Sequence, residues 1–106
     1  MKLSPDHLVR LRREVLQHVY NNHAAQMHRL QHLTLLDILR RRGYSTLGER
    51  DIITVLQDLC DRKYLTCETE HDDWSGDLLL KSIEITPVGR NLVEGFAKDE
   101  AVGFGR

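Results

Sequence analysis

Four of the chain's six histidines lie between residues 18 and 32, where imidazole groups offer metal ligands or proton acceptors near neutral pH. They are His18, His23, His28 and His32. His28 and His32 are one helical turn apart, but zinc takes three or four converging ligands, and no HExxH or CxxC motif accompanies them. The spacing therefore favours a polar border between helices. Joint protonation below the unperturbed pKa of about 6.5 is a stronger alternative than a metal site.

The two cysteines and the other polar residues form no recognisable catalytic or metal-binding pattern. Cys60, Cys67 and His71 have spacings unlike those of common zinc fingers. In a reducing compartment the cysteines are expected as buried small hydrophobic residues instead of a disulfide. No nucleophile elbow, phosphate-binding glycine loop or paired acid and base occurs, so we expect a non-enzymatic protein without a cofactor or metal.

Size and composition indicate one globular domain. A chain of 106 residues encloses one modest core, and a content of 41% hydrophobic and 29% charged residues excludes fibrous and disordered classes. The longest purely apolar run, Leu78 to Leu80, is too short to span a bilayer. No apolar segment of a secretory signal follows Lys2, so a cytoplasmic location is expected.

Charge is distributed unevenly along the chain. Residues 1–42 contain eight Lys and Arg against three Asp and Glu, a net charge of +5. Residues 43–106 contain seven against thirteen, a net charge of −6. An anionic partner is therefore expected to prefer the first part of the chain.

Two amphipathic helices are predicted in the first part. The first begins at residues 4–6, where a capping serine, a proline and an acid follow one another, and Asn21 and Asn22 end or bend it. Its apolar stripe consists of Leu8, Leu11, Val15 and Val19. The second helix is expected over residues 27–42, because Gly43 supplies a left-handed residue for its carboxyl end.

A third helix, a hairpin and a fourth helix are predicted next. ERDIITVLQDLCDRKYL has helical apolar spacing, with Ser45 or Thr46 as its cap. YLTCETE and LLLKSIEI are predicted as two strands joined by the turn HDDWSGD, with Trp74 packing back on the hairpin or, alternatively, stacking on a partner. Thr86 and Pro87 begin a last helix, TPVGRNLVEGFA, and residues 98–106 are expected as a flexible C-terminal tail.

This order predicts a mainly α fold with a small β-hairpin, a winged helix-turn-helix domain over residues 1–97 with a three-helix core, a wing and a C-terminal helix. LTLLDILRRRGYSTLGERDIITVLQDLCDRKYLTCE and ITPVGRNLVEG resemble the small winged-helix proteins of Mu-like prophages and, more loosely, ArsR/MarR-like bacterial regulators. The resemblance spans residues 8–96. It implies a dimeric, prophage-borne, DNA-binding protein. Where those proteins leave the helix through glycine and leucine, this chain has Lys63, Tyr64 and Leu65, so the helix must end without glycine.

Double-stranded DNA is one expected partner, although the third helix is a poor match in charge. Its face opposite the apolar residues contains Arg50, Asp51, Thr54, Asp58 and Asp61, and acids repel phosphate. The candidate DNA-binding residues are Arg40, Arg41, Arg42, Arg50, Thr54 and Gln57. The alternative for the arginines is solvation, local pairing and a favourable interaction with the helix dipole.

A protein-interaction module is the competing class. The first and last predicted helices carry apolar residues that a homodimer would bury. These residues are Leu8, Leu11, Val15, Val19, Leu92 and Phe96. The acidic face and wing would then meet a basic phage or host protein. Binding to DNA is expected to weaken with salt, whereas an apolar interface is not.

Overall fold

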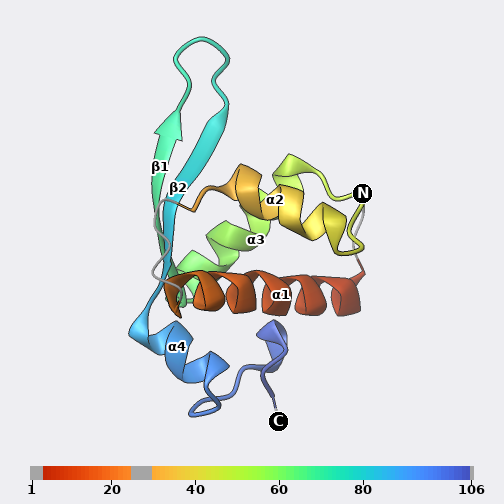
Figure 1. Ribbon diagram of the computed structural model, residues 1–106, viewed down its shortest axis with the longest axis vertical. Helices are drawn as coiled ribbons and strands as arrows, with labels where there is room; N and C mark the ends of the chain where they lie inside the picture. The colour runs from red at the N-terminus through yellow and green to blue at the C-terminus, as the bar shows by residue number, and fades with distance from the viewer. Residues whose placement is uncertain (1–3, 25–29, 106) are drawn as a thin grey trace.

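The computed structural model describes residues 4–24 and 30–105 and, within them, a mixed α/β fold of four α-helices and a two-stranded antiparallel hairpin (Figure 1). The elements are α1 (Pro5–Ala24), α2 (His32–Arg41), α3 (Glu49–Asp61), β1 (Leu65–His71), β2 (Leu78–Ile85), α4 (Pro87–Val93) and the 3-10 helix η1 (Glu100–Val102). α1 crosses the middle of the molecule, with α2 and α3 on one side and α4 and η1 on the other, and the hairpin extends beyond the helices. None of the described helices combines the length and apolarity needed to cross a bilayer.

Local capping explains where α3 and α4 begin. The Thr86 hydroxyl accepts a hydrogen bond from the Gly89 amide at 3.0 Å, and Pro87 occupies the first helical position, as predicted. α3 has Gly48 as its N-cap residue, and the Asp51 carboxylate accepts a hydrogen bond from the Gly48 amide at 2.9 Å. The predicted cap at Ser45 or Thr46 is therefore wrong, because a carboxylate inside the helix satisfies the amide before it.

Left-handed residues end α2 and α3. Gly43 has a φ of 110° after α2, as predicted. Lys63 takes the same role after α3 with a φ of 70°, and the Tyr64 amide donates to the Leu59 carbonyl at 3.0 Å. The helix thus ends without glycine, as expected, with a lysine in a conformation that disfavours residues with a Cβ.

Three element boundaries differ from the prediction. α1 continues through Asn21 and Asn22 to Ala24, so these residues neither end nor visibly bend it. α2 begins at His32, whereas residues 27–29 of the predicted second helix lie outside the described residues. α4 ends at Val93, earlier than the predicted limit, and Gly95 follows with a φ of 90°.

The predicted flexible tail packs against the rest of the protein. Val102 in η1 is fully buried in the core. The Tyr64 hydroxyl donates to the Asp99 carboxylate at 2.6 Å, and the Asp99 amide donates to the Phe104 carbonyl at 2.8 Å. In the described residues 98–105, a buried apolar side chain and the hydrogen bond from Tyr64 hold a segment that was expected to be flexible and that the sequence pattern gives no periodic reason to order; residue 106 lies outside the described residues.

A single core joins α1, α2, α3, β2 and α4. Leu11, Val15, Val19 and Leu92, which the sequence pattern assigns to a homodimer interface, are at most 1% exposed within this core. These four side chains are covered by the chain itself and are not available to a second copy, which corrects that assignment. Of the other two residues, Leu8 is partly buried against the core. Phe96 is 81% exposed.

A bulge lets β2 direct its apolar residues toward the helices. The register changes by one residue between Thr66 and Glu68 of β1, and Ser82 of β2 has a φ of 51°. The extra residue interrupts the alternation, so Leu80 and Ile83 are both buried although they are three positions apart. The Ile83 amide also donates to the Leu30 carbonyl at 3.1 Å, which joins the hairpin to the segment that precedes α2.

Candidate functional site

α3 exposes a row of polar residues at one-turn spacing. Arg50, Thr54 and Gln57 are all exposed and follow one another along one face of the helix. The hydroxyl of Thr54 donates to the Arg50 carbonyl at 2.8 Å, so it is currently satisfied by the helix itself. We call Arg50, Thr54 and Gln57 the α3 row; all three were predicted as DNA-binding residues.

Two of the three acids expected beside the α3 row are occupied inside the protein. Asp51 caps the start of α3 at the Gly48 amide. Asp58 forms ion pairs with Arg12 at 3.2 Å and with Arg62 at 2.8 Å. Of these three acids, Asp61 is the one that is exposed as the helical projection predicts; Glu49, at the start of α3, is also exposed and lies beside His32. The exposed face of the helix is therefore less acidic than its sequence implies.

The Asp58 ion pairs join distant parts of the chain. Arg62 contacts both Asp58 and, at 3.7 Å, Asp99, and its pKa is raised chiefly by the hydrogen bond to Asp58. Arg12 Nε lies near Asp58 without a hydrogen bond to it, while another nitrogen of the same guanidinium donates to the Ala101 carbonyl at 3.1 Å. Helix α1, helix α3 and the C-terminal segment thus meet around one carboxylate. Arg12 is engaged there and is not a free surface cation.

The three arginines at the end of α2 remain exposed but are differently engaged. Arg40 donates to the Leu47 carbonyl at 2.8 Å and so holds the turn before α3. Arg41 pairs with Asp37, one turn earlier, at 3.1 Å. Arg42 has no ion pair within the described residues, and its charge acts on His18 of α1. Arg40 and Arg41 thus have local partners although their side chains are exposed, and Arg42 is exposed without an ion pair in the described part of the chain.

His32 is fully buried and connects three elements. Its Nδ1 accepts a hydrogen bond from the Leu80 amide of β2 at 3.0 Å, and its Nε2 lies 2.8 Å from the Glu49 carboxylate of α3. Since Nδ1 accepts, the ring proton belongs on Nε2, where it is donated to Glu49. His32 is therefore a neutral connector between α2, α3 and the hairpin, not the border residue that helical spacing predicts.

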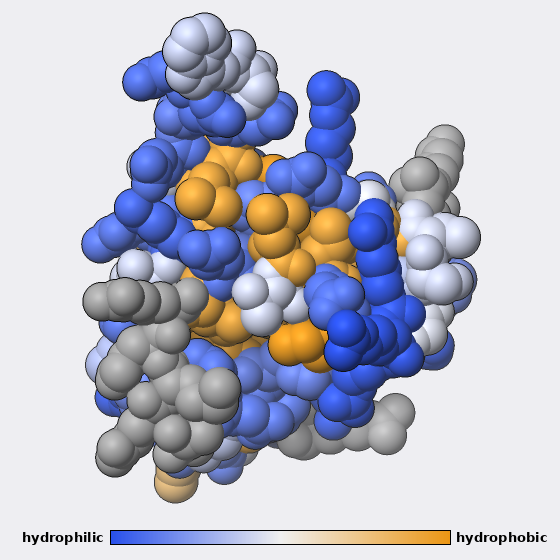
Figure 2. Space-filling view, turned by 45° about the horizontal axis from the view of Figure 1, so that its top comes forward, coloured by the Kyte–Doolittle hydropathy of each residue, from blue (hydrophilic) through white to orange (hydrophobic). Residues whose placement is uncertain are grey.

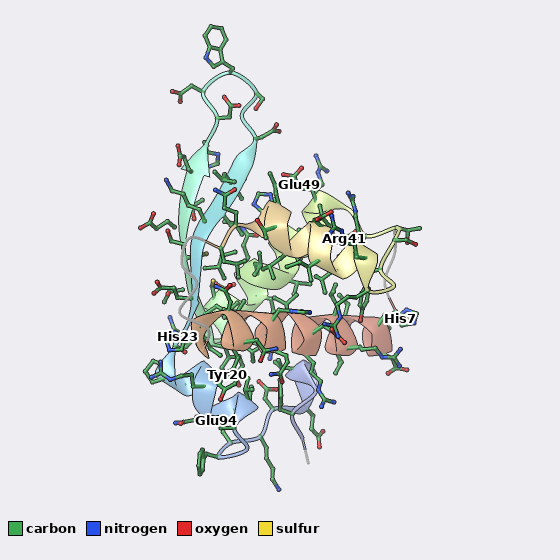
Figure 3. The ribbon with its side chains drawn as sticks, viewed as in Figure 1. His7, Tyr20, His23, Arg41, Glu49 and Glu94 are labelled. Atoms are coloured by element: carbon green, nitrogen blue, oxygen red, sulfur yellow. The ribbon has the colours of Figure 1, made fainter. Side chains whose placement is uncertain are left out.

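The other described histidines of residues 18–32, His18 and His23, lie on α1. His18 is partly buried on α1, and its pKa is lowered by burial and by Arg42, while Glu14 opposes the shift. His23 lies near the end of α1, where its Nε2 is 3.3 Å from Arg90, and Figure 3 shows it well away from Glu49. His28 lies outside the described residues. Within the described part of the chain, no three potential ligands are grouped to hold a metal ion.

The hairpin turn presents a side chain that the sequence interpretation misplaced. Trp74 is 98% exposed, so the expectation that it packs back on the hairpin is wrong. The Asp72 carboxylate accepts a hydrogen bond from the Trp74 amide at 2.9 Å, and this bond lowers the pKa of Asp72. The carboxylate therefore shapes the turn, and the turn projects the indole outward.

A groove lies between this turn and the starts of α2 and α3. It has a volume of about 600 Å³, and its lining includes Leu33, Glu49, Asp73, Trp74, Asp77 and Leu79. Figure 2 shows apolar surface below the protruding hairpin, bordered by hydrophilic residues. We call this the hairpin groove. The acidic turn with its single tryptophan could be read from the sequence as part of this groove. The leucines that the fold brings beneath the turn could not.

The two cysteines adjoin each other at the junction of α3 and β1. Their sulfur atoms are 3.4 Å apart, and both thiols are free and partly buried. Burial, followed by the hydrogen bond with Cys67, raises the pKa of Cys60 to about 12. A thiol with so high a pKa is a poor nucleophile near neutral pH.

Comparisons of the chain with protein-family models, with curated proteins and with solved structures gave no match.

Proposed function

We propose that this protein is a non-enzymatic, winged-helix DNA-binding regulator that reads duplex DNA with α3. The observation that carries the proposal is the α3 row: Arg50, Thr54 and Gln57 are exposed together, while Asp51 and Asp58 are engaged within the protein. Arginine matches the acceptors of guanine, and glutamine matches the edge of adenine, in the major groove. The row thus has the chemistry of direct base recognition.

The arrangement of the elements supports a winged helix. α2 and α3 are joined by a short turn, and the hairpin follows α3 as a wing would. The hydrogen bond from Ile83 to Leu30 ties the second strand of that hairpin to the segment before α2. The resemblance of residues 8–96 to small winged-helix proteins of Mu-like prophages points the same way, and a prophage regulator is the role that it suggests.

Charge restricts how DNA would approach. Exposed Arg41 and Arg42 at the end of α2 offer contacts to phosphate. The hairpin groove, in contrast, is lined by acids that repel phosphate. We therefore expect DNA to contact α3 and the α2 arginines while the hairpin turn remains outside the grooves of the duplex.

The test is fluorescence anisotropy with a pool of random duplexes, at low and then moderate salt, followed by measurements on a duplex selected from that pool. Arg50→Ala is expected to cost about 1 to 3 kcal/mol on the selected duplex and to relax specificity. Arg41→Ala is expected to weaken binding to all duplexes alike. Asp61→Asn is the matched control of opposite sign, because it removes an acid from the same helix and is expected to strengthen binding.

Absence of binding at low salt would reject the proposal. Equal effects of Arg50→Ala and Arg41→Ala on selected and random duplexes would retain DNA binding but reject base reading by the α3 row.

A second candidate function, a protein-interaction module, is favoured by one observation. Trp74 is almost completely exposed at the end of the hairpin, and tryptophan is one of the residue types enriched in the energetic centres of protein interfaces.

A further inference from the structure

We propose that the hairpin groove binds an arginine- or lysine-bearing segment of a partner protein that also inserts an apolar side chain. This goes beyond DNA recognition by α3, because it concerns the hairpin groove and a partner of opposite charge, although the groove adjoins the α3 row where Asp77 and Arg50 line a common hollow. Three features of the groove support it: unpaired acids, exposed apolar side chains and a fixed floor.

The acids of the groove lack cationic partners where they are most exposed. Glu70 is neutralised by Lys81 at 2.6 Å, and Asp72 is used to shape the turn. Asp73 and Asp77 are exposed, and within the described residues no ion pair joins either of them to a cation. Two carboxylates on one turn produce a local field that attracts cations and repels phosphate.

Exposed apolar surface distinguishes this groove from a merely acidic loop. Leu33 at the start of α2 is 47% exposed, and Leu79 of β2 also lines the groove. Trp74 stands at its outer end with nearly its whole indole in water. A guanidinium or ammonium group that stacks on an indole gains a cation–π interaction, and the adjacent carboxylates reinforce it. An apolar neighbour on the same segment would cover Leu33.

The floor of the groove is held in place before any partner arrives. His32 lines it and joins Leu80 of β2 to Glu49 of α3 through two hydrogen bonds. The hairpin and α3 are therefore fixed relative to each other, which lowers the ordering cost of binding. Nucleic acid and anionic membrane surfaces do not fit, because the acids would face their phosphates. A cationic and partly apolar protein segment fits all three features.

Trp74 is the chain's single tryptophan, so the emission of the full-length protein reports directly on this surface. The probe is a short synthetic peptide of alternating arginine and leucine without aromatic residues. Its control is the same peptide with glutamate in place of arginine. We expect the arginine peptide to shift the emission to shorter wavelength, with an affinity that falls as salt is added, and the glutamate peptide to have no effect.

Two matched double variants test the charges. Asp73→Asn with Asp77→Asn is expected to weaken arginine-peptide binding by about tenfold. Asp61→Asn with Glu84→Gln removes the same charge from exposed acids outside the groove and is expected to leave the affinity within about twofold of the wild type. All four positions are at the surface or on the turn, so unfolding curves of both proteins should match the wild type.

Trp74→Ala, followed with a dye-labelled peptide, is expected to weaken binding about fivefold, the size of a typical cation–π contribution. Three results would overturn the proposal. These are an unchanged emission with the arginine peptide, equal binding of the glutamate peptide, and equal weakening by both double variants.

An emission shift that appears without peptide and grows with protein concentration would also overturn it, in favour of a second copy as the occupant. DNA titrations separate this proposal from the previous one. Arg50→Ala should weaken DNA binding without weakening peptide binding, and the Asp73 and Asp77 variant should weaken peptide binding without weakening DNA binding.

Discussion

The exposed face of α3 and the turn of the hairpin both carry acids, but they use them differently. On α3, Asp51 caps the helix and Asp58 bridges Arg12 and Arg62. On the hairpin turn, Asp73 and Asp77 remain exposed, and within the described residues no ion pair joins either of them to a cation, although Arg50 lines a common hollow with Asp77. The number of acids in a stretch of sequence therefore does not determine its field, because pairing determines which charges reach a partner. This is why the two surfaces are assigned to partners of opposite charge.

The variant with the largest expected effect replaces His32, the residue that joins the hairpin to α3. His32→Ala removes the acceptor of the buried Leu80 amide and the donor to Glu49 and leaves a cavity. We expect the free energy of unfolding to fall by about 3 kcal/mol, measured by urea denaturation. Failure to fold would be an extreme form of the same result.

Two conservative variants separate the two hydrogen bonds. Asn at position 32 retains an acceptor near the place of Nδ1, whereas Gln retains a donor near the place of Nε2. The Leu80 bond is buried and Glu49 is partly exposed, so His32→Asn should preserve more stability than His32→Gln. The reverse order, or wild-type stability in His32→Ala, would contradict the role of His32 as a connector.

The second test compares one acid from each region. Asp58→Asn leaves Arg12 and Arg62 without their shared carboxylate, and Arg12 is mostly buried. We expect a loss of about 1 to 2 kcal/mol in the free energy of unfolding, discounted because the cluster is partly exposed to solvent. Asp73→Asn, in the exposed turn, should change it by less than about 0.5 kcal/mol. Equal effects would mean that the two sets of acids are not used differently.

Much of the fold could be predicted from local signals. Thr86 with Pro87, and Gly43 after α2, mark helix ends because a cap or a left-handed residue acts within a few positions. Pairing over long sequence distances could not be predicted in this way. Arg12 and Asp58 are joined only by the fold, as are His32 and Leu80. The α3 residues of the candidate site could therefore be predicted from the sequence. The ion pairs that neutralise Asp58 and the hairpin groove could not.

The smallest test concerns pH and the arginine-rich side of the molecule. Burial and the charge of Arg42 lower the pKa of His18 below its usual 6.5, so the folded state takes up a proton less readily than the unfolded chain. The stability that depends on neutral His18 is then complete above pH 6.5 and is lost as the pH falls below it. On the hairpin, the pKa of Asp72 is lowered from its usual 3.8. The stability that depends on ionised Asp72 is therefore complete above pH 3.8 and is lost only as the pH falls below that value.

Urea midpoints measured between pH 5.5 and 8 check this sign. His18→Gln, which cannot take up the proton, should flatten the decline on the acid side, whereas Asp72→Asn should leave it unchanged in that range. Arg42→Ala is the informative control, because it removes a cation that opposes protonation of His18 and should therefore reduce the decline without removing the histidine. A decline that persists unaltered in His18→Gln would assign the acid sensitivity to another group and break the link between the arginines of α2 and the histidine of α1.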